Sequence, residues 1–182
     1  MLICLDTSVL ARGMKGYRSS DPGNKAEKQR IEIAKDFIES LDEHQRILLP
    51  APVVSEYLAG LPKSHRDFAF KDLESRFIIV PFDEACSRLA SDIMDKVKEA
   101  KQTARDTVSR NEVKFDAVII AIACVQGASV IYTFDDQFKC LSDGRIRICE
   151  PSPPPRQLTF LPAPEQAEIV DIVAAKRKKK KV

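Results

Sequence analysis

The sequence predicts an α/β protein: a single domain with a central, mainly parallel sheet of about five strands sandwiched between helices. Short apolar runs rich in Val, Ile and Leu recur along the chain, longer segments with helical periodicity separate them, and the two kinds alternate up to about residue 150. Such alternation is typical of parallel sheets, because parallel strands are joined by helical crossovers. A chain of 182 residues is long enough to bury a substantial core.

Five segments have the composition of short buried strands. The first, "LICL", ends at Asp6, and the second, "RILLP", ends at Pro50 and Pro52. The fourth, "VIYT", carries β-branched and aromatic residues that suit a pleated, buried strand. The predicted strands are residues 2–5, 46–50, 76–82, 130–133 and 145–150.

Helices are predicted between these strands. Ile31, Ala34, Ile38 and Leu41 recur at helical spacing with charges between them. Pro52 is expected to open a helix, since a missing N–H costs nothing in a first turn. "FDAVIIAIACVQG" is apolar on nearly every side and is expected to lie buried. The predicted helices are residues 26–41, 52–60, 64–75, 83–106 and 115–127, and residues 13–25 are expected to form a loop.

Composition and charge divide the chain into a domain, residues 1–150, and a C-terminal extension, residues 151–182. The extension opens with "PSPPPRQLTFLPAP", which cannot continue a helix or a central strand, and ends with six positive charges at 176–181. We expect it to be flexible. The basic end fits an RNA tether, an import signal or a disordered tail, and composition alone does not choose among them.

The cysteines and the apolar runs predict a cytoplasmic protein. The five cysteines are widely spaced, odd in number and never in a CxxC pair, which argues against a zinc ribbon or a disulfide framework. Asp6 interrupts the N-terminus too early for a signal peptide. The longest wholly apolar run, residues 117–125, is too short to cross a bilayer, so no membrane partner is expected.

Four carboxylates from four segments are expected at one rim of the sheet. Ligands of open parallel sheets bind beyond the carboxyl ends of the strands. Asp6 follows the first strand and Asp135 the fourth, Glu56 lies on the helix after the second strand, and Asp116 is expected in or near the first turn of the apolar helix.

Each acid also has a simpler interpretation. Asp6 fits the N-cap of a helix beginning near Thr7. Asp116 fits a helix N-terminus through the dipole. Glu56 fits a solvated side chain, and Asp135 fits an ordinary turn.

A bound metal ion would explain all four acids together. Two carboxylates about 5 Å apart repel by about 3 kcal/mol at an effective dielectric of about 20, so a cluster must be neutralised. Mg²⁺ and Mn²⁺ prefer hard oxygen ligands and suit phosphodiester chemistry. His44 and His65 match no zinc spacing, so Mg²⁺ or Mn²⁺ is the expected cofactor.

The segments that carry these acids resemble the motifs of PIN-domain ribonucleases, most closely toxins of the VapC type. The resemblance covers about residues 1–150 and rests on four motifs in the family's order: "LDTSVL", "VVSEYLAG", "FDAVIIAIA" and "TFDDQF". It implies a metal-dependent endoribonuclease that activates water to cleave RNA, leaving a 5′-phosphate and a 3′-hydroxyl. It also implies an antitoxin that occludes the site, and a homodimer.

The resemblance implies a role for each matching residue. The metal-binding and catalytic acids would be Asp6, Glu56, Asp116 and Asp135. Thr7 or Ser8 would support the first acid. In the T-x-D-x-x-F pattern, Thr133 and Phe138 select Asp135 as the fourth acid and leave the role of its neighbour Asp136 open.

Cations near the acidic rim are candidates for contacts to the RNA backbone, because phosphate contacts dominate affinity. Arg12 and Lys15 follow the first motif, and Lys114 precedes the third. Other functions remain open: a PIN-like module in RNA processing, or a non-cleaving module that binds RNA or protein. A haloacid-dehalogenase phosphatase ranks low, because it expects an Asp where Ser8 stands.

Overall fold

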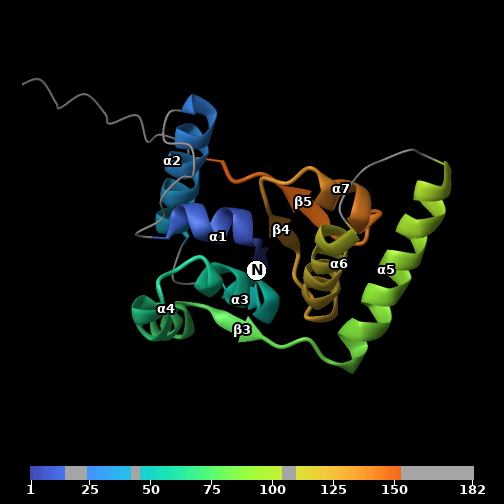
Figure 1. Ribbon diagram of the computed structural model, residues 1–182, viewed down its shortest axis with the longest axis horizontal. Coiled ribbons are helices and arrows are strands. Elements are labelled where there is room, and N and C mark those ends of the chain that lie inside the picture. Colours follow the sequence, from blue (N-terminus) through green and yellow to red (C-terminus); the bar gives the residue numbers. More distant parts are fainter. Residues whose placement is uncertain (15–23, 42–45, 104–109, 153–182) are drawn as a thin grey trace, which may run out of the picture.

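A computed structural model describes residues 1–14, 24–41, 46–103 and 110–152, with only the backbone described within 97–112. The described residues form a five-stranded, fully parallel sheet in the order β3-β2-β1-β4-β5. Figure 1 shows β3 on one side of the molecule and β4 and β5 on the other. The predicted α/β fold with a five-stranded parallel sheet is confirmed. The strands are β1 (Leu2–Leu5), β2 (Arg46–Pro50), β3 (Ile78–Val80), β4 (Val130–Tyr132) and β5 (Arg147–Cys149).

The central strand β1 pairs with β2 on one side and with β4 on the other. Its last residue, Leu5, lies opposite Tyr132 of β4. The next residues, Asp6 and Thr133, therefore leave the sheet side by side at its carboxyl rim. The parallel pairing continues one step further, because the Asp6 N–H donates to the carbonyl of Tyr132 at 3.1 Å.

Four of the predicted helices match the structure to within about one residue at each described end. Pro52 stands in the first turn of α3, as its missing N–H predicts. The long helix α5 is described as far as Thr103, so the predicted end at residue 106 lies outside the described residues. These helices are α2 (Lys25–Ser40), α3 (Ala51–Ala59), α4 (Lys63–Arg76) and α5 (Glu84–Thr103).

The apolar helix α6 (Arg110–Val125) begins earlier than the sequence predicts. The expected start at Phe115 rested on apolar periodicity, and the polar residues before it gave no such signal. Asp116 is therefore the seventh residue of the helix and lies in its second turn. The sequence predicts that it lies in or near the first turn, and the structure places it just beyond that turn, where the interaction with the helix dipole is weaker.

Two short helices follow strands; a helix beginning near Thr7 was considered only as the simpler interpretation of Asp6, and the other helix was not predicted. They are α1 (Thr7–Gly13), which follows β1, and α7 (Gln137–Ser142), which follows β4. With seven and six residues they are too short to show a helical period. The N-terminal ends of these two helices carry residues of the site described below.

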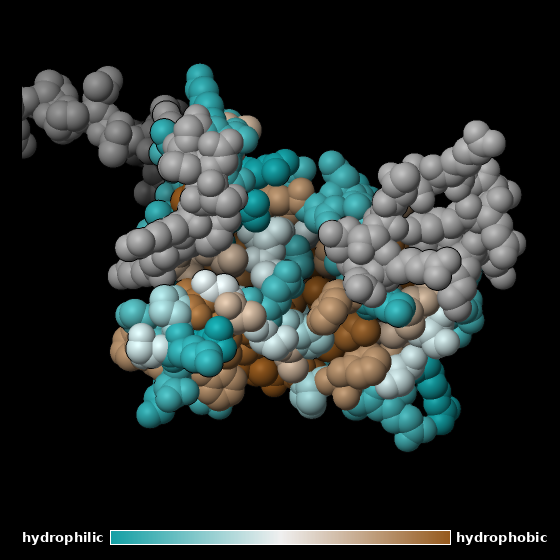
Figure 2. All heavy atoms as spheres, in the orientation of Figure 1, coloured by the Kyte–Doolittle hydropathy of each residue, from teal (hydrophilic) through white to brown (hydrophobic). Residues whose placement is uncertain are grey.

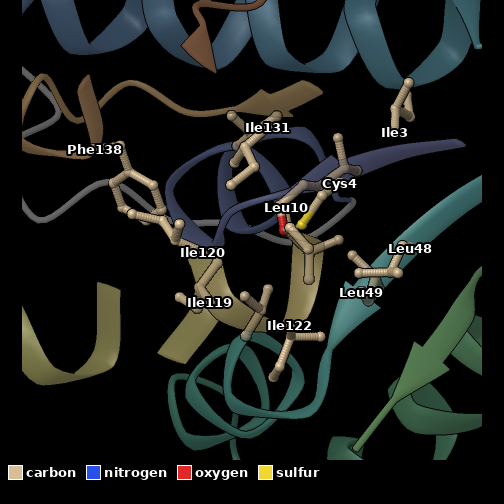
Figure 3. Packing of buried hydrophobic residues seen from close by; sticks show 14 of the residues in the cluster. Ile3, Cys4, Leu10, Leu48, Leu49, Ile119, Ile120, Ile122, Ile131 and Phe138 are labelled. Atoms are coloured by element: carbon tan, nitrogen blue, oxygen red, sulfur yellow. The ribbon is translucent and has the colours of Figure 1, made fainter. Parts of the chain in front are cut away.

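The core lies between the sheet and α6. Figure 3 shows Ile119, Ile120 and Ile122 of α6 pointing toward the strands, with Cys4 and Ile131 above them. All five of these side chains are at most 2% exposed. On the opposite face of the sheet, the ring of Phe37 in α2 packs on Tyr132 with ring centroids 4.5 Å apart. Burial on both faces explains why these strands are continuous apolar runs.

The surface of the described residues mixes polar and apolar side chains. Figure 2 shows apolar residues in the lower middle of the face it presents, where Figure 1 draws α3, β3 and α6. Several aromatic side chains are exposed, including Phe68 at 79% and Phe115 at 55%. Among the helices of the described part, none is both long and apolar enough to span a bilayer.

Candidate active site

Asp6 occupies the junction between the central strand and α1. Its backbone is extended, and its Oδ2 accepts a hydrogen bond from the backbone N–H of Ser8, so it is the N-cap of α1. The capping role considered from the sequence is therefore confirmed. The same oxygen also accepts from the hydroxyls of Ser8 at 2.7 Å and Thr133 at 2.8 Å, and the residue is only 6% exposed.

The hydroxyls of Ser8 and Thr133 join Asp6 to the turn that follows β4. Each hydroxyl donates to Asp6 and accepts from a backbone N–H of that turn. The N–H of Phe134 donates to Ser8 Oγ at 3.0 Å, and the N–H of Asp135 donates to Thr133 Oγ1 at 2.9 Å. The two hydroxyls therefore fix the carboxylate of the first strand against the backbone of the fourth.

Glu56 approaches the same rim from α3. Its side chain is exposed, and its Oε2 accepts a hydrogen bond from the Thr7 hydroxyl at 2.8 Å. Thr7 is the residue after Asp6 and the first residue of α1. Neighbouring hydroxyls at the start of α1 therefore bind two of the four predicted acids. The Ser8 hydroxyl donates to Asp6, and the Thr7 hydroxyl donates to Glu56.

Asp135 and Asp136 differ in their contacts, although they are neighbours. Asp135 is partly buried, and its Oδ1 accepts from the N–H of Gln137 at 2.8 Å, which supports the start of α7. Asp136 is exposed and forms an ion pair with Lys139 at 2.8 Å. The hydrogen bond from Lys139 and its positive charge lower the pKa of Asp136. The structure thus gives Asp135 the turn contact that was the simpler interpretation.

The remaining predicted residues differ in their exposure and in their contacts. Asp116 is partly buried on α6, and Lys114 on the same helix is exposed. Arg12 on α1 is partly buried and forms an ion pair with Glu27 of α2. Lys15 lies outside the described residues, as do most of the predicted loop and the extension beyond residue 152.

All the hydrogen-bond donors around Asp6 are neutral. In the described part of the chain, no Lys, Arg or His side chain forms an ion pair with Asp6, Glu56 or Asp135. Asp6 also affects a buried thiol of the central strand, Cys4. Burial raises the pKa of the Cys4 thiol well above its ordinary value, and the negative charge of Asp6 raises it further.

Carboxylate oxygens are the kind of ligand that a hard divalent cation prefers, but among the described residues the predicted acids do not come together as a group of three or more ligands. Oδ2 of Asp6 takes all three hydrogen bonds, and none of the described donors reaches Oδ1. A carboxylate whose Oδ2 is fixed by these three donors could present Oδ1 to Mg²⁺ or Mn²⁺. As the side chains stand, however, the described residues contain no group of three or more His, Cys, Asp or Glu that could hold a metal ion. Ligation by several acids would need changes of side-chain rotamer, and Glu56 is exposed enough to make one.

Two contributors to this site were not singled out from the sequence. Phe134 stands between Thr133 and Asp135, and only its backbone N–H reaches Ser8, so its residue type gave no signal. Glu27 pairs with Arg12 across 15 positions of the sequence, on a separate helix. No local motif marks such a pair.

Comparison with solved structures finds the same fold in several bacterial complexes. VapBC-1 from nontypeable Haemophilus influenzae aligns with a TM-score of 0.58 at 14% identity, and VapBC2 from Rickettsia felis, solved with a DNA fragment from the promoter, with 0.56 at 14%. Each alignment covers 82% of this chain and 98% of the other. A toxin–antitoxin complex from Klebsiella pneumoniae aligns with a TM-score of 0.54 at 16% identity, and the alignment covers 82% of this chain and 97% of the other. At these identities the likeness is one of fold.

The comparison with family models is more specific, whereas no curated protein matches the chain. The model of the PIN domain matches residues 3–143, which runs from the central strand to the end of α7 and includes Asp6, Glu56, Asp116 and Asp135. The match covers well over half of the sequence. The chain therefore belongs to the PIN domain family.

Proposed function

We propose that this PIN domain protein is a divalent-metal-dependent endoribonuclease of the cytoplasm and the toxin of a toxin–antitoxin pair. One observation carries the proposal. A buried carboxylate, Asp6, stands at the carboxyl end of the central strand with three neutral donors on one oxygen and the other oxygen left for a ligand. Because no Lys, Arg or His of the described residues pairs with this carboxylate, a bound cation would stabilise its negative charge.

The residues that would hold the metal ion are Asp6, Glu56, Asp116 and Asp135. The chemistry that a divalent ion supplies in such a site is activation of the attacking water and neutralisation of charge on the phosphodiester. The chain's own part is to fix these acids. Ser8 and Thr133 orient Asp6, and Thr7 orients Glu56. We favour Asp135 over Asp136 as the fourth acid, because Lys139 already neutralises Asp136.

The RNA would lie over the rim, with its phosphates close to basic side chains. Lys114 is exposed on α6, which leaves its ammonium group able to contact an RNA phosphate. Arg12 already binds Glu27 and the carbonyl of Ser8, so its proposed contact with RNA would compete with bonds inside the protein.

A protein partner is proposed from the fold and from the surface. The solved complexes from Haemophilus influenzae and Klebsiella pneumoniae contain VapBC-1 and a toxin–antitoxin pair, respectively. Exposed aromatic side chains such as Phe68 and Phe115 are the kind of residue that a partner covers. We propose an antitoxin as this partner and a homodimer as the assembly.

A non-cleaving PIN module that binds RNA or protein is the second candidate. The observation that favours it is that the described acids, as they stand, form no three-ligand group. The two candidates differ in their response to metal, because a non-cleaving module leaves RNA intact in both Mg²⁺ and Mn²⁺.

The test is cleavage of a panel of structured and single-stranded RNAs by the full chain in Mg²⁺, Mn²⁺ or chelator. We expect cleavage that requires metal, and a loss of about 10²- to 10⁴-fold in Asp6→Asn, the range for a group that acts directly in the chemistry. Asp83→Asn is the matched control. Asp83 also accepts a backbone N–H at a helix start, from Cys86 at 2.8 Å, but on α5. Cleavage in chelator, or full activity of Asp6→Asn, would contradict the proposal.

A further inference from the structure

The guanidinium of Arg12 contacts three segments at once, at the edge of the candidate site. Its Nη1 donates to the carbonyl of Ser8 at 2.8 Å. Its Nε and Nη2 donate to the two carboxylate oxygens of Glu27 at 2.9 and 3.2 Å, a two-point ion pair with α2. Both side chains are largely removed from solvent, with 19% and 15% of their areas exposed. A paired, half-buried fork of this kind holds a defined geometry.

The ring of Phe134 lies against the same guanidinium. Arg12 and Arg30 each approach its centroid to 5.7 Å, one from α1 and the other from α2. Phe134 is only 9% exposed, and its N–H donates to the Ser8 hydroxyl. The two cations therefore hold the residue that sits between Thr133 and Asp135.

Close packing of α1 on α2 makes this reach possible. Gly13, the residue after Arg12, faces α2 so closely that an added Cβ would lie 2.8 Å from the carbonyl oxygen of Ala34 and 2.3 Å from Ile38 Cδ1. A side chain at position 13 would separate the two helices. Arg12 could then no longer reach Glu27 and Ser8 together.

We infer that Arg12 is a positioning residue for the metal-binding acids, acting through Ser8 and Phe134. Arg12 binds the carbonyl of Ser8, whose hydroxyl donates to Asp6. Arg12 also lies over the ring of Phe134, the residue before Asp135. The guanidinium therefore positions both acids indirectly. The inference rests on the proposed function and deepens it. It also differs from the prediction that Arg12 binds the RNA backbone, because loss of a backbone contact would raise KM for RNA and leave the affinity for metal unchanged.

Arg12→Lys separates these roles. Lysine keeps the charge and can pair with Glu27, but one ammonium group cannot also donate to Ser8 and lie flat on Phe134. We expect kcat to fall about three- to tenfold and the Kd for Mn²⁺ to rise by a similar factor, at the lower end of the effect of residues that orient metal ligands. KM for RNA should stay within about twofold of the wild-type value.

Arg76→Lys is the matched control. Arg76 also pairs with a carboxylate, Asp72 at 3.7 Å, and lies over a ring, Phe77 at 5.1 Å, but on α4. We expect its kcat and its Kd for Mn²⁺ to equal those of the wild type. If Arg12→Lys does not fold, Glu27→Gln takes its place, with a smaller rise in the Kd for Mn²⁺ expected.

Three results would overturn the inference. The first is an unchanged Kd for Mn²⁺ in Arg12→Lys, or in Glu27→Gln where that variant replaces it. The second is a change no larger than in Arg76→Lys. The third is a raised KM with unchanged kcat, which would make Arg12 an RNA contact. Asp6→Asn in the same assays separates the two proposals: if it too keeps its affinity for Mn²⁺ and its activity, the proposed function fails as well.

Discussion

Two carboxylates in turns of this protein, Asp6 and Asp143, are bound in opposite ways. Asp6 is buried, and its three donors are two hydroxyls and a backbone N–H, all neutral. Asp143 follows α7 and is 54% exposed, and its Oδ2 binds two cations, Lys96 at 2.6 Å and Arg145 at 3.2 Å. The hydrogen bond from Lys96 and its charge lower the pKa of Asp143.

The comparison separates a carboxylate that is held in place from one that is neutralised. Cations beside Asp143 cancel its charge and join α5 to the turn after α7. Hydroxyls beside Asp6 fix its direction and leave its charge in place. The same contrast holds between Asp135, whose carboxylate accepts a backbone N–H and no other donor of the described residues, and its neighbour Asp136, which pairs with Lys139. A charge that is oriented but not cancelled is what a cation site requires.

Thr133→Val breaks the arrangement at Asp6 with little change in side-chain volume. Thr133 is 1% exposed, and the change removes a donor to Asp6 and leaves the N–H of Asp135 without its acceptor. We expect a loss of about 1–3 kcal/mol in the free energy of unfolding, the cost of an unpaired buried polar group. Cleavage should fall about 10- to 100-fold. Denaturant unfolding and single-turnover cleavage measure the two effects.

Thr133→Ser is the control for that variant, because it keeps the hydroxyl and loses only a methyl group. We expect it to retain most of the activity. Equal losses in the Val and Ser variants would show that packing around Thr133, and not its hydrogen bonds, matters to Asp6.

Lys96→Met tests the other carboxylate and should have the smallest effect. The lowered pKa of Asp143 means that the ion pair stabilises the folded state above the ordinary carboxyl pKa, and that this contribution is lost as the pH falls through the lowered value. We expect the variant to be slightly less stable than the wild type at neutral pH. The difference between the two should become smaller as the pH falls from neutral to about 2, below the ordinary carboxyl pKa.

Thermal unfolding at the two pH values gives the comparison, and RNA cleavage at neutral pH should be unchanged. A loss of cleavage in Lys96→Met would mean that the Asp143 turn contributes to the site, and the contrast drawn above would fail.

The sheet and the rim could be predicted from the sequence because they depend on local patterns. Strands buried on both faces appear as apolar runs, and the rule that parallel strands end at one rim predicted that Asp6 and Asp135 follow the ends of their strands at the same edge of the sheet. The short helices α1 and α7 could not be found by periodicity, and the start of α6 was hidden by its polar first turns. The bond between Ser8 Oγ and the N–H of Phe134 joins residues 126 positions apart, and no sequence pattern specifies it.

The most direct measurement is a calorimetric titration of Mn²⁺ into the full chain and into two matched variants, Asp6→Asn and Asp143→Asn. If the neutral donors orient Asp6 for a cation, the wild type and Asp143→Asn should bind Mn²⁺ with the same Kd. Asp6→Asn should bind at least about tenfold more weakly. Equal affinity in all three proteins, or no binding by the wild type, would contradict this account of Asp6.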